Sequence, residues 1–185
     1  MIYIQELKNT MLNKELSDKD LKKGSSNRGV FLIIISLFIF MIFTYPLNLL
    51  VVSDYRSGEI LKTWILKEDE FKVSYTHSVE LTEVEEYYEI NEGYIILKET
   101  IFRSYGAGLP ATTKYDFEKT NDGFRIYNIK EKFKELIYRT GAVRADHRLF
   151  LNNEEYKFLD FSSPMQAVKF SSRKISFIRY LTRRL

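Results

Sequence analysis

The sequence predicts an all-β fold, a small antiparallel β-sandwich or barrel, preceded by one N-terminal transmembrane helix. Two observations predict it. Residues 30–52 contain no charged side chain, as expected of a membrane span. From residue 49 onward, short segments rich in β-branched and aromatic residues follow one another. The chain of 185 residues is therefore expected to divide into a cytoplasmic tail (1–29), a transmembrane signal anchor (30–48) and an extracytoplasmic all-β domain (49–185).

The apolar segment reads VFLIIISLFIFMIFTY at residues 30–45, and the uncharged run continues beyond it. Roughly 20 apolar residues are needed for a helix to cross a bilayer core. A buried core helix is disfavoured because the segment has no polar face and no amphipathic period. A cleaved signal peptide is disfavoured because residues 1–29 would form a long n-region and no small-x-small cleavage pattern follows. An uncleaved signal anchor fits best.

The charges that flank the span predict its orientation, since cytoplasmic flanks carry an excess of lysine and arginine. More cations precede the span than follow it. We therefore expect a single-pass protein of the cell membrane with its N-terminus in the cytoplasm. The tail is either a short amphipathic helix at the inner membrane surface or a flexible segment. The flanking cations are Lys14, Lys19, Lys22, Lys23 and Arg28 before the span, and Arg56, Lys62 and Lys67 after it.

Beyond the span, the hydrophobic pattern changes to the period of two that is typical of strands. Turn signals rich in Gly and Asn separate several of the segments, which favours an antiparallel sandwich or barrel. Residues 129–138 are compatible with a short helix as well as with a strand. The expected strands lie within residues 49–54, 59–66, 70–79, 83–90, 94–102, 113–118, 124–129, 136–140, 147–151, 156–161 and 174–181.

Composition excludes several kinds of chemistry. The chain has no cysteine, which rules out disulfides, thiolate zinc sites and cysteine nucleophiles. It has two histidines, so a metal site of three histidines is also ruled out. There is no G-x-S-x-G elbow, H-E-x-x-H or phosphate-binding loop. We expect neither an enzyme nor a resident cofactor.

The segment 69–91 predicts a hairpin with a carboxylate on its apolar face. A turn centred on Leu81-Thr82 sets His77 opposite Glu86 and matches apolar residues along the rest of the hairpin. One interpretation is a His77–Glu86 hydrogen bond that relieves the cost of a buried carboxylate. The other is ligand binding or proton handling at a cavity.

Two further motifs supply candidate binding residues. Gly106 and Gly108 follow a predicted strand in the run GAGLP, which reads as a tight turn, with an anion-binding nest of backbone amides as the alternative. Asp146, His147 and Arg148 are consecutive, and side chains alternate between the two faces of a strand. His147 therefore shares a face with the apolar residues of the strand, whereas Asp146 and Arg148 point to the opposite face. We expect His147 at the core or its rim and Arg148 in a surface ion pair.

Taken in order, these motifs resemble an uncharacterised bacterial and archaeal domain, one of the families of unknown function. The resemblance covers about residues 49–160 and the preceding span. It implies no activity. It does imply a context, because such proteins tend to be encoded beside TRAP-type solute transporters of the TAXI class. The matching motifs are Tyr75-Thr76-His77-Ser78-Val79, Glu86 after the turn, Gly106-Ala107-Gly108-Leu109-Pro110, and Asp146-His147-Arg148-Leu149.

These observations favour a membrane-anchored extracytoplasmic accessory protein that binds the membrane subunit or the solute receptor of such a transporter. An alternative is a small ligand- or metal-binding module, conceivably hydrolytic, centred on His77, Glu86 and His147, since two imidazoles and a carboxylate can hold zinc. A structural envelope protein is the third possibility.

The net charge of +3 conceals an uneven distribution. Residues 54–160 carry more acids than bases, whereas 161–185 contain six cations and no acid. An extracytoplasmic location disfavours nucleic acid as the partner of this basic end. Anionic lipid headgroups, reached through Arg179, Arg183 and Arg184, or an acidic partner face are the alternatives to a solvated tail.

Overall fold

The computed structural model describes residues 2–104, 113–121, 123–141 and 144–182, and within the first helix the side chains of residues 5–7, 9–15 and 28–44. The chain forms two compact units. One comprises residues 1–45 together with 176–185, and the other comprises residues 46–175.

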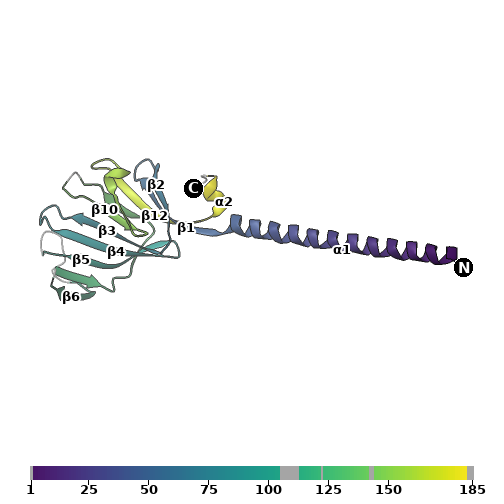
Figure 1. Cartoon of the computed structure of the whole chain (residues 1–185). Coiled ribbons are helices and arrows are strands. Elements are labelled where there is room, and N and C mark those ends of the chain that lie inside the picture. Colours follow the sequence, from purple (N-terminus) through teal and green to yellow (C-terminus); the bar gives the residue numbers. More distant parts are fainter. Residues whose placement is uncertain (1, 105–112, 122, 142–143, 183–185) are drawn as a thin grey trace. The chain divides into compact units, whose positions relative to one another are not determined.

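The first unit contains one long helix, α1 (Ile2–Thr44), which Figure 1 shows as uninterrupted. The predicted tail is therefore continuous with the apolar segment in one helix. A second, short helix, α2 (Phe177–Leu181), belongs to the same unit, and the Phe177 N–H donates to the Tyr45 carbonyl at 2.9 Å. Among the described residues, no helix meets both the length and the hydropathy required of a membrane span.

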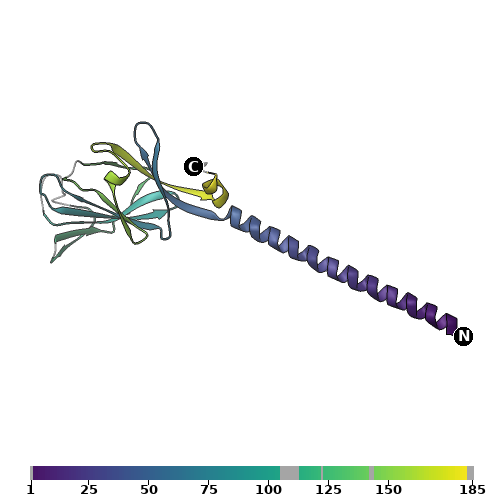
Figure 2. The ribbon, with the colours of Figure 1, turned by 45° about the horizontal axis from the view of Figure 1, so that its top comes forward.

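The second unit is a sandwich of two antiparallel sheets, which confirms the predicted all-β class. The four-stranded sheet has the order β2-β1-β12-β9, and the eight-stranded sheet has the order β11-β10-β3-β4-β5-β7-β6, with β8 pairing β5. Both views show β12, in yellow-green, alongside β1, in blue (Figures 1 and 2). The strands are β1 (Pro46–Asp54), β2 (Ile60–Ile65), β3 (Glu70–Thr76), β4 (Glu83–Asn91), β5 (Tyr94–Phe102), β6 (Asp116–Thr120), β7 (Gly123–Tyr127), β8 (Glu131–Phe133), β9 (Leu136–Arg139), β10 (Arg148–Leu151), β11 (Glu154–Lys157) and β12 (Ala167–Ser176), with a 3-10 turn, η1 (Phe158–Asp160), after β11.

Several boundaries differ from the sequence-based expectations. The first strand begins at Pro46, because proline lacks an N–H and cannot continue the helix. Within residues 129–138 the chain forms β8 and the start of β9 rather than a helix, and it crosses from one sheet to the other, since β8 pairs β5 and β9 pairs β12. The strand predicted at 70–79 ends at Thr76, and the strand predicted at 156–161 is replaced by the end of β11 and the turn η1. The strand predicted at 174–181 overlaps only the end of β12, which begins at Ala167 and ends at Ser176, after which the chain turns into α2.

The core lies between the two sheets and follows the alternation of side chains along each strand. The four-stranded sheet contributes side chains from β1, β9 and β12, and the eight-stranded sheet contributes them from β3, β4, β5 and β10. Phe158 of η1 is fully buried against them. The core side chains include Leu50, Val52, Phe71, Val73, Tyr88, Ile90, Ile95, Leu136, Leu149, Leu151, Val168 and Phe170.

Candidate functional site

The β3–β4 hairpin pairs in a register four residues away from the predicted one. Val73, rather than His77, lies opposite Glu86. The reason is the connection, because β3 ends at Thr76 and the whole of residues 77–82 forms a loop, closed by the His77 N–H donating to the Thr82 carbonyl at 2.8 Å. The predicted His77–Glu86 pair is therefore wrong.

His77 forms hydrogen bonds within the loop of residues 77–82. Its Nδ1 accepts a hydrogen bond from the Glu80 N–H at 3.3 Å, and its carbonyl accepts one from the Leu81 N–H at 3.0 Å. Leu81 has a φ of +54°, which a side-chain-bearing residue adopts at some cost. The histidine therefore stabilises a strained turn.

Glu86 points into the sandwich, as its alternation in β4 predicts. Its carboxylate accepts hydrogen bonds from three phenol hydroxyls. Tyr75 donates to Oε1 at 3.5 Å, Tyr88 donates to Oε2 at 3.1 Å, and Tyr138 donates to Oε2 at short range. The hydroxyls of Tyr88 and Tyr138 are also within 2.7 Å of each other. We call these four residues the carboxylate–tyrosine cluster.

The cluster joins the two sheets. Tyr75 and Tyr88 stand on β3 and β4 of the eight-stranded sheet, whereas Tyr138 stands on β9 of the four-stranded sheet. Hydrogen bonds to an ionised acceptor are stronger than neutral ones. A single carboxylate therefore ties the facing layers together at one point.

His147 packs beside this cluster. Its ring stacks on Tyr75 with centroids 5.2 Å apart, and it also contacts the rings of Tyr138 and Phe158. Its Nδ1 accepts the Gly141 N–H at 3.2 Å, which places the proton of the neutral ring on Nε2. Burial lowers the pKa of His147, so the neutral form is favoured. His147 is half-buried, so the expectation of a histidine at the core or its rim is confirmed.

Burial also sets the protonation of the cluster. It raises the pKa of Glu86, and the three tyrosine hydroxyls oppose that effect in part. Burial and the Glu86 charge raise the pKa values of Tyr75 and Tyr88 above their ordinary range. The phenols therefore remain proton donors, and the carboxyl is the group that exchanges a proton.

Asp146 and Arg148 do not join the cluster. The Arg148 guanidinium forms an ion pair with Asp146 and a second one with Glu155 at 2.9 Å, which confirms the predicted surface pairing. Gly106 and Gly108 lie outside the described residues. Across the part of the chain that the structure describes, no group of three or more His, Cys, Asp or Glu residues could hold a metal ion. His77, Glu86 and His147 accordingly form no metal site.

The sequence reasoning missed the tyrosines. The predicted register set Tyr75 opposite Tyr88 as a packing pair within the hairpin. No role was predicted for Tyr138. A signal was present, because a carboxylate on an otherwise apolar strand face needs donors, and phenol hydroxyls on the same face can supply them.

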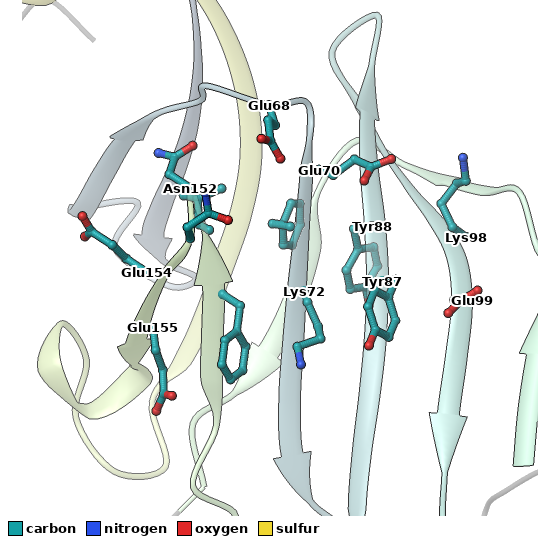
Figure 3. A pocket seen from close by; sticks show the side chains of 14 residues that line it. Glu68, Glu70, Lys72, Tyr87, Tyr88, Lys98, Glu99, Asn152, Glu154 and Glu155 are labelled. Atoms are coloured by element: carbon teal, nitrogen blue, oxygen red, sulfur yellow. The ribbon is translucent and has the colours of Figure 1, made fainter. Parts of the chain in front are cut away.

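A second feature lies on the opposite face of the eight-stranded sheet. This outer groove has a volume of about 820 Å³ and is bordered by β3, β4, β5, β10 and β11 (Figure 3). A row of directly opposed residues crosses it from strand to strand. In order from β11 to β5 the row is Glu155, Phe150, Lys72, Tyr87 and Glu99.

Lys72 lies on the floor of the outer groove between two aromatic rings. Its Nζ is 4.2 Å from the ring centre of Phe150 and 5.7 Å from that of Tyr87, and it forms an ion pair with Glu85 at 2.6 Å. Burial and the Glu85 carboxylate raise the pKa of Tyr87 to about 12, so its hydroxyl stays protonated and donates to Glu85.

Comparison with known proteins adds a family model. Residues 71–158 match DUF1850, a domain of unknown function. The match runs from β3 to η1, so it includes the hairpin, the carboxylate–tyrosine cluster and His147. It confirms a resemblance to an uncharacterised family and assigns neither an activity nor a partner. No curated protein matches the chain. No solved structure matches it.

Replacing Glu86 with Gln should change how stability depends on pH. Because the pKa of Glu86 is raised in the fold, the folded protein binds more protons than the unfolded chain between the ordinary pKa of 4.5 and the raised one. The free energy of unfolding therefore falls as pH rises through that window. The Glu86→Gln variant lacks this pH-dependent contribution. Its free energy of unfolding, relative to that of the wild type, should therefore increase with pH.

The measurement is chemical denaturation of the full chain in detergent at several pH values, followed by the fluorescence of the single tryptophan, Trp64, which is buried. The lowered pKa of His147 produces the opposite slope below 6.5, but it is common to both proteins and cancels in the difference. A difference that does not vary with pH would contradict the raised pKa.

Removing one donor should destabilise the sandwich. Tyr138→Phe deletes the hydroxyl that reaches Glu86 from the other sheet. The buried carboxylate then keeps only the Tyr75 and Tyr88 donors, and we expect a loss of about 1–3 kcal/mol in the free energy of unfolding. Tyr55→Phe, at an exposed tyrosine, is the control and should change it by less than about 0.5 kcal/mol. In the Glu86→Gln background the effect of Tyr138→Phe should be smaller; equal effects in both backgrounds would show that the two residues are not coupled.

Proposed function

We propose that the protein is a membrane-anchored accessory protein whose β domain lies outside the cell membrane and binds a component of a TAXI-class TRAP transporter. The component is the membrane subunit or the solute receptor. Three separate considerations support the proposal: the surface of α1, the resemblance of the β domain, and the kind of chemistry that its side chains offer.

The observation that carries the proposal is the apolar surface of α1. Thirteen side chains between Val30 and Phe43 expose between 38% and 67% of their surface. Apolar surface in contact with water costs about 25 cal/mol per Å², and soluble proteins rarely expose so large a patch. A bilayer removes that cost. The residues are Val30, Phe31, Leu32, Ile33, Ile34, Ile35, Leu37, Phe38, Ile39, Phe40, Met41, Ile42 and Phe43.

The chemistry of the β domain supports a binding role. The oxygens of Glu86 are occupied by tyrosine hydroxyls, and His147 is stacked among aromatic rings. Neither group is arranged as a nucleophile with an adjacent base, the arrangement that nucleophilic catalysis uses. The transporter as partner rests on the resemblance described from the sequence.

The basic end supplies a second contact with the membrane in this proposal. Ile178 and Leu181 of α2 are exposed, and Arg179 lies between them. Apolar side chains with interspersed cations are typical of segments that bind an anionic membrane surface. Arg183 and Arg184 extend the basic run in the sequence but lie outside the described residues.

The anchor and its partner can be tested on the same preparation. The full chain, tagged at its N-terminus, should remain with membranes after an alkaline carbonate wash and should co-purify with TRAP subunits after mild solubilisation. The double variant Ile35→Arg/Phe38→Arg should leave the membrane, since each arginine at the centre of a span costs about 2.5–3.5 kcal/mol. Thr10→Arg, in the tail, is the matched control.

Release of the wild type by carbonate would refute the anchor. Retention of the chain without any TRAP subunit in the purified material would refute the accessory role while leaving the anchor in place.

The lipid contact can be followed with one spin label, because the chain has no native cysteine. A label at Ile178→Cys should collide more often with lipid-dissolved oxygen in anionic than in neutral bilayers. Truncation after Thr182 should reduce that difference, since it removes two cations. A label at Ile137→Cys, on an exposed position of β9, should show no difference in collision rate between the two bilayers. Equal collision rates at Ile178 in both bilayers would count against lipid contact.

A further inference from the structure

The outer groove crosses five neighbouring strands, and its row from Glu155 to Glu99 therefore covers four inter-strand steps. At about 4.8 Å per step, the row is roughly 19 Å long, which is the length of about six residues of extended chain. Figure 3 shows Lys72 and Tyr87 side by side on the floor, with Glu68 and Glu70 along one long edge of the row, above its middle.

Most charges that line the outer groove are already paired. Lys72 pairs with Glu85 and Lys98 with Glu89, so neither lysine presents an uncompensated positive charge. Two of the acidic lining residues are paired as well: Glu155 bonds Arg148, and Glu99 bonds Arg125.

Three carboxylates of the rim remain. Within the described residues, Glu68, Glu70 and Glu154 form no ion pair with a lysine or arginine. The hydroxyl of Tyr156 donates to Glu154, which leaves its negative charge in place. Lys98 interacts electrostatically with Glu70 without forming an ion pair with it, so the rim keeps a net negative charge, which repels phosphates and anionic lipid.

The three carboxylates do not act as one site for a metal ion. Over the described part of the chain they belong to no group that could hold a metal ion. Each one is instead placed to meet a separate cationic group. Between them the floor offers the rings of Phe150 and Tyr87, which attract cations through their faces and pack against aliphatic stems.

We propose that the outer groove docks a basic, extended segment of a partner protein, whose lysine or arginine side chains meet Glu68, Glu70 and Glu154 while their stems cover Phe150 and Tyr87. The inference deepens the proposed function, since the groove would be the surface at which the accessory protein holds its partner. It also explains why a hydrophilic sheet face carries two large aromatic side chains at its centre.

The test uses the full chain in uncharged detergent and a fluorescent peptide of about eight residues that alternates arginine with serine, long enough to span the row. Binding is measured by fluorescence anisotropy at low salt. The same peptide with citrulline in place of arginine keeps the shape and removes the charge. We expect the arginine peptide to bind and the citrulline peptide to bind at least about tenfold more weakly.

The triple variant Glu68→Gln/Glu70→Gln/Glu154→Gln should weaken binding of the arginine peptide by about tenfold, because three rim ion pairs are lost. Gln preserves the shape of each side chain, and circular dichroism verifies the fold. The matched control, Glu59→Gln/Glu118→Gln/Glu131→Gln, removes the same charge from positions that do not line the groove and should change binding by less than about twofold. Phe150→Leu, which removes the ring and keeps an apolar side chain, should weaken binding by about threefold.

Equal weakening by the two triple variants would overturn the proposal, since the peptide would then respond to net charge alone. Wild-type protein that does not distinguish arginine from citrulline would overturn it as well. The accessory role can fail while the groove proposal holds. In that case the peptide would bind with the expected pattern, but no TRAP subunit would co-purify with the protein. A rim triple variant that loses the peptide and still retains the transporter would show that the groove does not hold that partner.

Discussion

The carboxylate–tyrosine cluster is the constraint around which the sandwich is arranged. A carboxylate placed between two sheets without donors would cost several kcal/mol, and Glu86 reduces that cost by accepting from three hydroxyls. Because Tyr138 comes from the other sheet, the bonds form only when β9 faces β3 and β4 in one relative position. The aromatic packing of His147 and Phe158 surrounds the same point.

The fold class and the inward face of the β3–β4 hairpin could be predicted from the sequence, but the register of the hairpin could not. Alternation repeats every two residues, so a shift by any even number leaves the same side chains inside. The predicted and observed registers differ by four, and both place Val84, Glu86 and Tyr88 in the core. The loop length decides between them, and residues 77–82 carry no turn motif strong enough to specify it.

The site was predictable only in part, for a related reason. Glu86 and His147 stand out in the sequence as polar groups on apolar faces, and both lie where that pattern places them. Their partner Tyr138 is 52 residues from Glu86, and only the pairing of β9 with β12 brings it there. The outer groove depends in the same way on strand order, since β10 lies beside β3 and β11 lies beside β10, although both follow β3 by more than 70 residues.

The two faces of the eight-stranded sheet therefore differ in what remains available to another molecule. On the inner face, hydrogen bonds between the sheets occupy the carboxylate, and burial keeps the neighbouring phenols protonated and His147 neutral. On the outer face, ion pairs neutralise the charged side chains on the floor of the outer groove, and negative charge remains at its rim. Polar groups whose hydrogen bonds are made within the protein stabilise the structure, whereas uncompensated surface charge determines which partners can bind. In the binding role that we propose, recognition takes place on this outer surface, and the buried cluster supports the fold.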